Sequence, residues 1–481
     1  MEKKFVTYEE FGAVGDGKTD DMPALVKTHE YANEHNLPVH ARKGAQYYIG
    51  GKALTMVIKT SCNFYDAEFI IDDVNLEDIN KNLIIVATSA QQFVPEITSL
   101  KKGQKKVDFP HEGNVYVRAF TNSHKVYIRK GLNMNSGIDP SDCFIVDKDG
   151  NILNDINWDY PSFSKIYARS VDEEPITIDG GKFITIANQA ESKYNYHHRN
   201  IMVRRSNVTI RNLNYYVVGE GDHGAPYAGF ICAEETNNFL LENCTLCPHK
   251  TYYTESKIPG QMVGMGTYGL SVRASTFARL IGVKQFHSIH AAPYWGLMGS
   301  NFSKDMLLEN CEISRFDAHC GVTNATLRNC HFGKSGILII GFGEFTIESC
   351  TVSSFVFASF RPDYGSFFDG KLVIKDCVWN TKDEPYYLLA AQNKGDHDFG
   401  YKCMLPQEII IDGLTINDEK STREEPIAIM PDYDDEYTDG KPFAYQPTKK
   451  LVLKNISVAS GKDYIVMHKP DQYKDMDIVI E

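Results

Sequence analysis

The sequence carries little positive charge for its length. It has 50 Lys and Arg against 63 Asp and Glu, a formal net charge of −13 over 481 residues. Proteins that bind nucleic acid need clustered Lys and Arg to contact the phosphates, so this balance argues against a nucleic-acid partner. The apolar runs are also far too short to cross a bilayer, and we expect no membrane partner.

The N-terminus lacks the apolar core of a signal peptide, because it reads Met1-Glu-Lys-Lys-Phe-Val-Thr-Tyr8. A paired Cys-x-x-Cys metal motif is also missing, since Cys244 and Cys247 have the spacing but stand alone. The chain has 11 Cys, and many unpaired Cys are typical of a reducing compartment. These features predict a cytoplasmic protein, with secretion after removal of a signal as the alternative.

A short phrase recurs through the second half of the chain. In each copy apolar residues alternate with polar ones, the period of a strand with one buried face. Successive copies lie roughly 19 to 42 residues apart, a spacing typical of repeat proteins. The clearest copies are Phe239–Cys244, Met306–Cys311, Ala325–Cys330, Phe345–Cys350 and Leu372–Cys377.

One such strand per turn, stacked on its neighbours, predicts a parallel β-helix. The Asn-Cys pair that closes several copies indicates that the strand ends there and the chain bends. Because Cys falls at the same place in five copies, we interpret it as a buried ladder of small apolar side chains and not as disulfides or metal ligands. The Asp-rich run Asp432–Glu436 has no fixed ligand spacing and is interpreted as a solvated loop; calcium binding is the alternative.

A motif near the N-terminus adds a resemblance to a known superfamily. Phe11-Gly-Ala-Val-Gly-Asp-Gly-Lys-Thr-Asp-Asp21 resembles the opening signature of the pectate-lyase-like right-handed β-helix proteins. That superfamily includes polygalacturonase-like hydrolases, polysaccharide lyases, epimerases and phage tailspikes. The resemblance implies a right-handed parallel β-helix that acts on carbohydrate. Gly221-Asp-His-Gly224 partly resembles a Gly-His-Gly element of the hydrolases, but their other elements are absent and no catalytic residue is carried over.

Three regions are predicted along the chain. Residues 1–91 form an N-terminal cap and the first coils, with a helix from about Met22 to His35 whose N-terminus is capped by Thr19–Asp21 and which covers the end of the solenoid. Residues 175–481 form the main parallel β-helix. Between them, residues 92–174 lack the repeat phrase and are predicted to be an inserted antiparallel β subdomain. The predicted fold class of the whole chain is therefore all-β.

The insertion is predicted from strand-like segments and one strong turn signal. Lys148-Asp-Gly-Asn151 favours a tight hairpin turn. The expected strands are Val115–Phe120, Lys125–Arg129 and Cys143–Ile152.

A β-helix has a packed interior, so ligands bind on its outer face. Counting back from the repeat phrases places one set of polar and aromatic residues on a single face, with Ile337 equivalent to Asp317 one coil later. The predicted catalytic residues are Asp317, Asp363, His319 and Arg361. The predicted substrate-binding residues are Tyr268, Tyr294, Trp295, Tyr364, Glu220, Asp222 and His223.

These residues suggest acid–base chemistry on a sugar. Asp317 and Asp363 would lie two coils apart, on the order of 9 to 10 Å between backbones, and side chains that lean together would bring the carboxyls into the range used by glycosidases. Arg361 would keep Asp363 ionised, while like charge would raise the pKa of the other carboxyl. No metal or cofactor is required.

The first functional hypothesis is therefore a glycoside hydrolase that cleaves an oligo- or polysaccharide with this Asp pair. The second is a polysaccharide lyase or epimerase acting on a uronic acid, with His319, Arg361 or a Tyr as base. The third is a non-catalytic glycan-binding β-helix, such as a tailspike-like adhesin.

Overall fold

The chain is nearly all β. The structure is a computed structural model, and it describes residues 3–131, 133–382, 384–391, 398–433 and 445–481. One α-helix, α1 (Met22–His35), and three short 3₁₀ helices, η1 (Glu9–Phe11), η2 (Pro362–Tyr364) and η3 (Pro470–Tyr473), accompany the strands. Within the described residues, no helix is long and apolar enough to cross a membrane.

Two compact units make up the chain. The first contains residues 1–91, 169–256 and 260–298, and the second contains residues 92–168, 257–259 and 299–481. Both contain stacked coils of a right-handed parallel β-helix, so the predicted fold class is confirmed.

In the first unit, neighbouring coils pair in parallel. Ile184 of β11 lies between Ile70 of β6 and Tyr216 of β14 in the ladder. The strands of this unit are β1 (Val6–Thr7), β2 (Asp16–Asp20), β3 (Val39–His40), β4 (Gln46–Ile49), β5 (Met56–Ile58), β6 (Cys62–Asp72), β7 (Ile84–Val86), β11 (Ile176–Ile186), β12 (Ile201–Val203), β13 (Val208–Arg211), β14 (Asn214–Val218), β15 (Ile231–Glu234), β16 (Leu240–Glu242), β17 (Thr245–Leu246), β18 (Tyr252–Glu255), β19 (Met262–Met265), β20 (Leu270–Arg273), β21 (Arg279–Ile281) and β22 (Lys284–Gln285).

The helix α1 begins where the sequence predicts, but it is capped differently. Asp21 is the N-cap residue, yet its carboxylate accepts from the backbone N–H of Val14 and Gly15 at 2.7 and 3.0 Å. The first helical N–H, of Met22, donates to Asp20 Oδ1 at 3.2 Å instead. The carboxylates of this motif therefore hold the N-terminal turn together, in agreement with a structural role.

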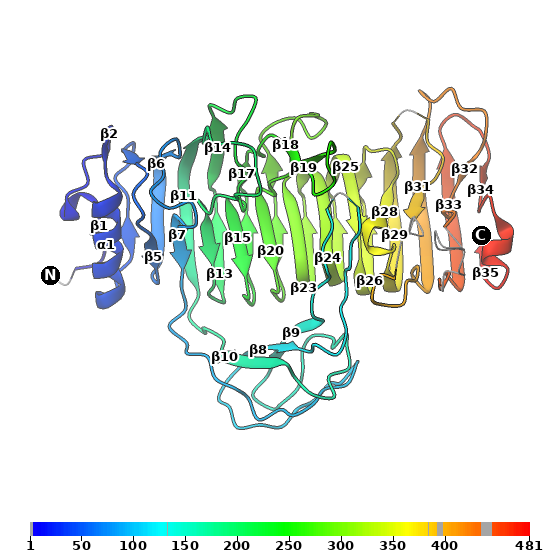
Figure 1. Cartoon of the computed structure of the whole chain (residues 1–481), viewed down its shortest axis with the longest axis horizontal. Helices are drawn as coiled ribbons and strands as arrows, with labels where there is room; N and C mark the ends of the chain where they lie inside the picture. The colour runs from blue at the N-terminus through cyan, green and yellow to red at the C-terminus, as the bar shows by residue number, and fades with distance from the viewer. Residues whose placement is uncertain (1–2, 132, 383, 392–397, 434–444) are drawn as a thin grey trace. The chain divides into compact units, whose positions relative to one another are not determined.

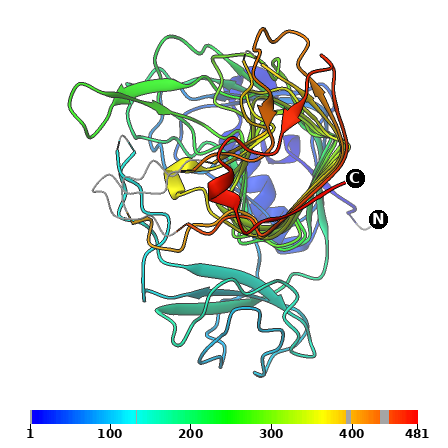
Figure 2. The ribbon, with the colours of Figure 1, turned by 90° about the vertical axis from the view of Figure 1, so that its right-hand side faces the viewer.

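The coils of the second unit stack with their apolar side chains in register. Figure 1 shows their strands running in the same direction, and Figure 2 shows the coils end-on, superposed on one another. The strands of these coils are β23 (Met298–Glu309), β24 (Glu312–Arg328), β25 (His331–Ile339), β26 (Gly341–Glu348), β27 (Thr351–Val352), β28 (Ala358–Phe360), β29 (Phe368–Asn380), β30 (Leu389–Ala391), β31 (Glu408–Asn417), β32 (Ile427–Ala428), β33 (Lys450–Val458), β34 (Tyr464–Ile465) and β35 (Asp477–Ile480).

One column of the core shows the register. Aliphatic residues at the same place in six successive coils pair along the ladder, and all but the last are buried. Each coil therefore covers the apolar face of the one before it. The column consists of Leu327, Ile347, Ile374, Ile411, Leu453 and Ile480.

The repeat phrase ends at a residue in the left-handed region, as the predicted bend requires. Asn and Asp tolerate this conformation better than most residues, and Gly adopts it without strain. The corner residues of six coils in the second unit have φ between 50° and 79°: Asn310, Asn329, Ser349, Asp376, Gly413 and Asn455.

The Cys that follows each corner forms the predicted buried ladder. The backbone N–H of Cys311, Cys330 and Cys350 each donates to the thiol of the next Cys in the stack at 3.4 Å, and the ladder ends at Cys377. All 11 Cys are free thiols. Burial contributes to a raised pKa of about 12 for the Cys244 thiol and about 11 for Cys377.

The inserted segment forms a small antiparallel sheet with its own apolar core. Its strands are β8 (Val115–Phe120), β9 (Ser141–Val146) and β10 (Lys165–Ser170), in the order β10-β8-β9. β8 pairs antiparallel with β9, and the predicted turn is present, with Gly150 N donating to Asp147 O at 2.9 Å. The predicted strand Lys125–Arg129 is wrong, because Val126 and Arg129 make only isolated bridges.

Polar contacts attach the insertion to the coils of the same unit. Asn154 Nδ2 donates to Asp305 at 2.6 Å, and Asn157 Nδ2 donates to Thr323 Oγ1 at 2.8 Å. The buried ammonium of Lys304 contacts the Asp142 carboxylate. The acidic run that was considered for calcium lies partly outside the described residues, at Asp434–Glu436.

The thiol ladder predicts how the protein responds to thiol reagents. In the native state, DTNB should modify at most one Cys quickly, because ten thiols are buried and only Cys320 is partly exposed. After unfolding in guanidinium without reductant, all 11 should titrate. A lower count in the unfolded protein would reveal disulfides and contradict the ladder.

Candidate functional site

Three polar side chains alternate along β24. Arg315, Asp317 and His319 are two residues apart in a strand, so they lie on the same face, while Phe316 and Ala318 are buried on the other. The sequence therefore assigned Asp317 and His319 to the correct face of the coil.

The predicted stacking was one residue out of register. Asp317 pairs with Leu338 of β25, which in turn pairs with Ser359 of β28. Ile337, expected beside Asp317, pairs with Phe316 instead. The ladder changes its offset between Asp317 and the repeat phrase from which the count was made, with an irregularity between Thr323 and Ala325, and this accounts for the error.

A single guanidinium joins the two predicted catalytic carboxylates. Arg361 follows β28 and precedes η2, and its Nη1 donates to both Asp317 oxygens at 2.6 Å. Its Nε and Nη2 donate to Asp363 at 3.1 and 2.8 Å. Asp317, Asp363 and Arg361 are thus brought together as predicted, but as an ion-paired group.

Two further arginines complete the group, which we call the guanidinium cluster (Arg129, Arg315, Arg361, Asp317 and Asp363). Arg315 Nη2 donates to Asp317 at 2.8 Å, and Arg129 of the insertion donates from Nη2 to Asp363 at 2.6 Å. Three cations against two anions leave the cluster with a formal charge of +1.

The charges of the cluster exclude the predicted general acid. Burial by itself would raise the pKa of Asp317, which is 0% exposed, but Arg361 and Arg315 outweigh burial and hold its pKa well below its ordinary value. The pKa of Asp363 is lowered in the same way by Arg361 and Arg129. The expected rise in pKa of one carboxyl is therefore wrong, because guanidiniums and not a second carboxylate surround each.

His319 lies beside this cluster and is partly exposed. Burial and the charge of Arg361 lower its pKa to about 4, so the imidazole is neutral at physiological pH. The Asn301 amide oxygen lies 3.2 Å from Nδ1, and an amide oxygen only accepts. Nδ1 therefore carries the hydrogen, and Nε2 carries the lone pair.

Tyr364 does not fit the predicted role of stacking on a sugar. Its side chain is 3% exposed. The guanidiniums of Arg129 and Arg361 lie 4.6 and 5.3 Å from its ring centre. The ring centres of Tyr127 and Tyr364 are 5.4 Å apart in an edge-to-face arrangement. We correct this prediction: Tyr364 supports the two arginines by cation–π contact.

The other six predicted binding residues lie in the first unit. The Glu220 carboxylate accepts from His249 Nδ1 and from Lys250 N, both at 3.1 Å. Asp222 and His223 are exposed just beyond it. Glu220 is therefore a fixed acceptor, while Asp222 and His223 face solvent.

The predicted aromatic residues are only partly exposed. The rings of Tyr294 and His287 are stacked, with their centres 4.4 Å apart. The rings of Tyr268 and Trp295 are arranged edge to face, with their centres 6.1 Å apart. The indole of Trp295 packs on Gly266, where a Cβ would lie 1.8 Å from the ring. Neighbouring residues therefore already cover part of the ring surface that was expected to stack on sugar.

Sequence reasoning missed several residues of both units. Arg315 was predictable from its spacing, because it lies two residues before Asp317 on the same strand. Arg129 comes from the insertion, and no local pattern links it to Asp363. In the first unit, burial raises the pKa of Asp73 to about 6 although Arg199 Nε lies 2.7 Å from it. Asp73 is 1% exposed, so it cannot reach a substrate.

The residues described here include no group of three or more His, Cys, Asp and Glu side chains placed to hold a metal ion.

Comparison with known proteins supports the fold. No family model matches the sequence, and no curated protein matches it. Among solved structures, the tailspike protein gp49 from Pseudomonas phage LKA1 is similar over 94% of this chain and 81% of its own, with a TM-score of 0.53 and 14% identity. The Pseudomonas phage phi297 tailspike gp61 is similar over 95% and 81%, with a TM-score of 0.51 and 11% identity. The fold-level resemblance deduced from residues 11–21 is confirmed.

Replacing Asp317 tests the strength of the cluster. Asp317→Asn leaves Arg361 and Arg315 buried with one charge partner fewer, and should lower the free energy of unfolding by about 3 to 5 kcal/mol, measured by urea unfolding at pH 7. Because the folded-state pKa of Asp317 lies below that of the unfolded chain, its contribution is complete above about pH 4 and is lost as the pH falls.

A surface ion pair of the same unit provides the control. Glu348 contacts Arg328 and Lys375 at the exposed face of the coils, and Glu348→Gln should change stability little. Equal effects of the two substitutions would contradict the buried cluster.

Proposed function

We propose that the protein acts on a saccharide that carries a carboxylate, and that it removes the proton from the carbon atom next to that carboxylate. The observation that supports this most is the neutral, partly exposed His319 beside the guanidinium cluster. This is the lyase or epimerase chemistry that ranked second on the sequence alone.

His319 has the properties of a general base. A base must be deprotonated at the working pH, and the lowered pKa of His319 meets this requirement. The Asn301 contact fixes the tautomer, so that the basic Nε2 has a defined orientation. A pKa of about 4 makes the base weak, and the substrate proton must therefore be made more acidic.

The guanidinium cluster supplies that activation. Removing a proton next to a carboxylate builds negative charge on the carboxylate oxygens, and nearby cations stabilise that charge. The cluster carries a formal charge of +1, and Asp363, whose side chain is 31% exposed, marks its accessible edge. Within this proposal, a substrate carboxylate interacts with Arg129 and Arg361 near that edge.

The proposed reaction balances as follows. His319 Nε2 accepts the proton from the carbon next to the carboxylate. In elimination, the electron pair forms a carbon–carbon double bond, the bond from the neighbouring carbon to the glycosidic oxygen breaks, and that oxygen gains a proton from water. The hydroxide that remains takes the proton from His319, which returns to its neutral form. In epimerisation, water protonates the carbanion on its opposite face, the hydroxide that remains takes the proton from His319, and no bond to oxygen breaks.

A glycoside hydrolase is the second candidate, because Asp363 is ionised and partly exposed. These properties suit the base or nucleophile of a glycosidase. The described cluster provides no protonated carboxyl as acid, since the pKa values of both Asp317 and Asp363 are lowered. This chemistry therefore needs an acid from elsewhere and ranks below proton abstraction.

Product analysis tests the choice. The protein is incubated with polysaccharides that contain uronic acid and with neutral ones, and products are followed by mass spectrometry and by the absorbance of unsaturated uronides. We expect an unsaturated or epimerised product from a uronate polymer only, and a loss of at least a hundredfold in kcat/KM for His319→Gln.

His331→Gln is the matched control, since His331 is partly exposed on β25 of the same unit, and it should retain activity. Addition of water that depends on Asp363 and not on His319 would establish the hydrolase instead. Binding without turnover of any substrate would leave the glycan-binding role.

The pH profile gives a separate prediction. Because the pKa of His319 is lowered to about 4, kcat/KM should stay nearly constant from pH 7.5 down to about pH 5 and fall only below that. An ordinary histidine would give a decline near its usual pKa of about 6.5. A decline centred there, in protein that circular dichroism shows to be folded, would contradict the assignment of His319 as the neutral base.

A further inference from the structure

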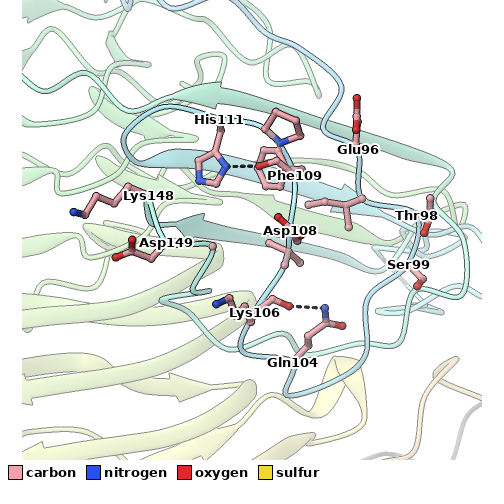
Figure 3. A pocket seen from close by; sticks show the side chains of 14 residues that line it. Glu96, Thr98, Ser99, Gln104, Lys106, Asp108, Phe109, His111, Lys148 and Asp149 are labelled. Carbon is pink, nitrogen blue, oxygen red and sulfur yellow. Dashed lines mark hydrogen bonds between the residues drawn. The ribbon is translucent and has the colours of Figure 1, made fainter.

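The inserted subdomain contains a cavity of about 660 Å³ that shares no residue with the guanidinium cluster. Its volume is in the range of small-molecule sites, about 300 to 1,000 Å³. Its walls are formed by residues 96–99, 104, 106–111 and 148–150. Figure 3 shows Lys148 and Asp149 on one side of the cavity, Glu96, Thr98 and Ser99 on the opposite side, and Asp108 between them.

The base of the cavity is rigid. Ile97, Val107 and Phe109 line it and belong to the buried apolar core of the insertion. Val107 N donates to Gly150 O at 2.9 Å, which ties the two walls together. Gly150 has a φ of 81°, and a Cβ there would lie 2.3 Å from Val107 O, so this close approach requires glycine.

His111 braces the same two walls. Its Nδ1 lies 2.8 Å from Phe109 O, and its Nε2 lies 2.8 Å from Asp147 O. The ring therefore lies between the two walls and contacts a backbone carbonyl of each. The cavity is therefore held in shape before any ligand enters it.

The charged side chains around the cavity are not ion-paired with one another. Three carboxylates, of Glu96, Asp108 and Asp149, and two ammonium groups, of Lys106 and Lys148, line it. Within the described chain, none of these five side chains makes an ion pair or side-chain hydrogen bond. Three carboxylates against two ammonium groups give these side chains a net formal charge of −1.

We propose that this cavity is a second saccharide-binding site, for a neutral sugar unit. A sugar hydroxyl both donates and accepts hydrogen bonds, so it can be held between a carboxylate and an ammonium group, and the hydroxyls of Thr98 and Ser99 add further partners. A lining with a net formal charge of −1 does not attract an anionic ligand, which favours a neutral sugar. The site is independent of the proposed chemistry at His319.

Titration calorimetry with short glycans tests the site. The probes are the neutral trisaccharides maltotriose, cellotriose and xylotriose, with trigalacturonate as the anionic probe. The experiment uses the full chain carrying His319→Gln, so that turnover cannot affect the result. At least one neutral probe should bind, and Asp108→Asn and Lys148→Met should each weaken it about tenfold or more through loss of a charge-assisted hydrogen bond.

Lys101→Met is the matched control, because Lys101 is exposed on the insertion but does not line the cavity. It should bind as the parent does. The proposal fails if no neutral probe binds, if the cavity variants bind as tightly as the control, or if trigalacturonate binds more tightly than every neutral probe. Because all variants carry His319→Gln, failure here leaves the proposed function untouched, and the reverse also holds.

Discussion

The geometry of one corner repeated in every coil determines the rest of the structure. Each strand of the repeat ends at a residue in the left-handed region, mostly Asn, Asp or Gly, and the next residue turns inward. Because the corner recurs at the same place, the coils stack in register and cover one another's apolar faces. In the second unit, the four Cys that follow the corners stack as a buried ladder with hydrogen bonds from backbone to sulfur. This register brings Arg315, Asp317 and His319 onto one outer face, where long-range contacts then define their chemistry.

On that face, charge pairing decides what each residue can do. Arg361 binds Asp317 and Asp363 together, and the insertion contributes Arg129. The carboxylates that resemble a glycosidase pair are held ionised by this pairing. The same positive surroundings, with burial, keep His319 neutral. The cluster thus converts an expected carboxylate pair into a cationic site beside a neutral base, which suits proton abstraction better than protonation of a leaving group.

The fold was predictable from the sequence because the repeat phrase has a strand period and a fixed corner. Helix α1, strand β8 and the turn at Lys148–Asn151 also follow from local patterns. The site was predictable only in part. Asp317, His319, Arg361 and Asp363 were grouped correctly, but the one-residue slip at the irregularity in β24 misplaced Ile337. The pairing of Arg129 with Asp363 could not be predicted, because residues 234 apart in sequence meet only through the docking of the insertion. Burial of Tyr364 beneath two guanidiniums likewise depends on that docking.

The central claim is that His319 is a neutral imidazole with its lone pair on Nε2, and ¹⁵N NMR of protein labelled at histidine measures this directly. The His319 signals are identified by their loss in His319→Gln. We predict ¹⁵N shifts of a neutral ring, with the hydrogen on Nδ1, that do not change between pH 8 and about pH 5. Imidazolium shifts in this range, or a hydrogen on Nε2 in the neutral ring, would contradict the account.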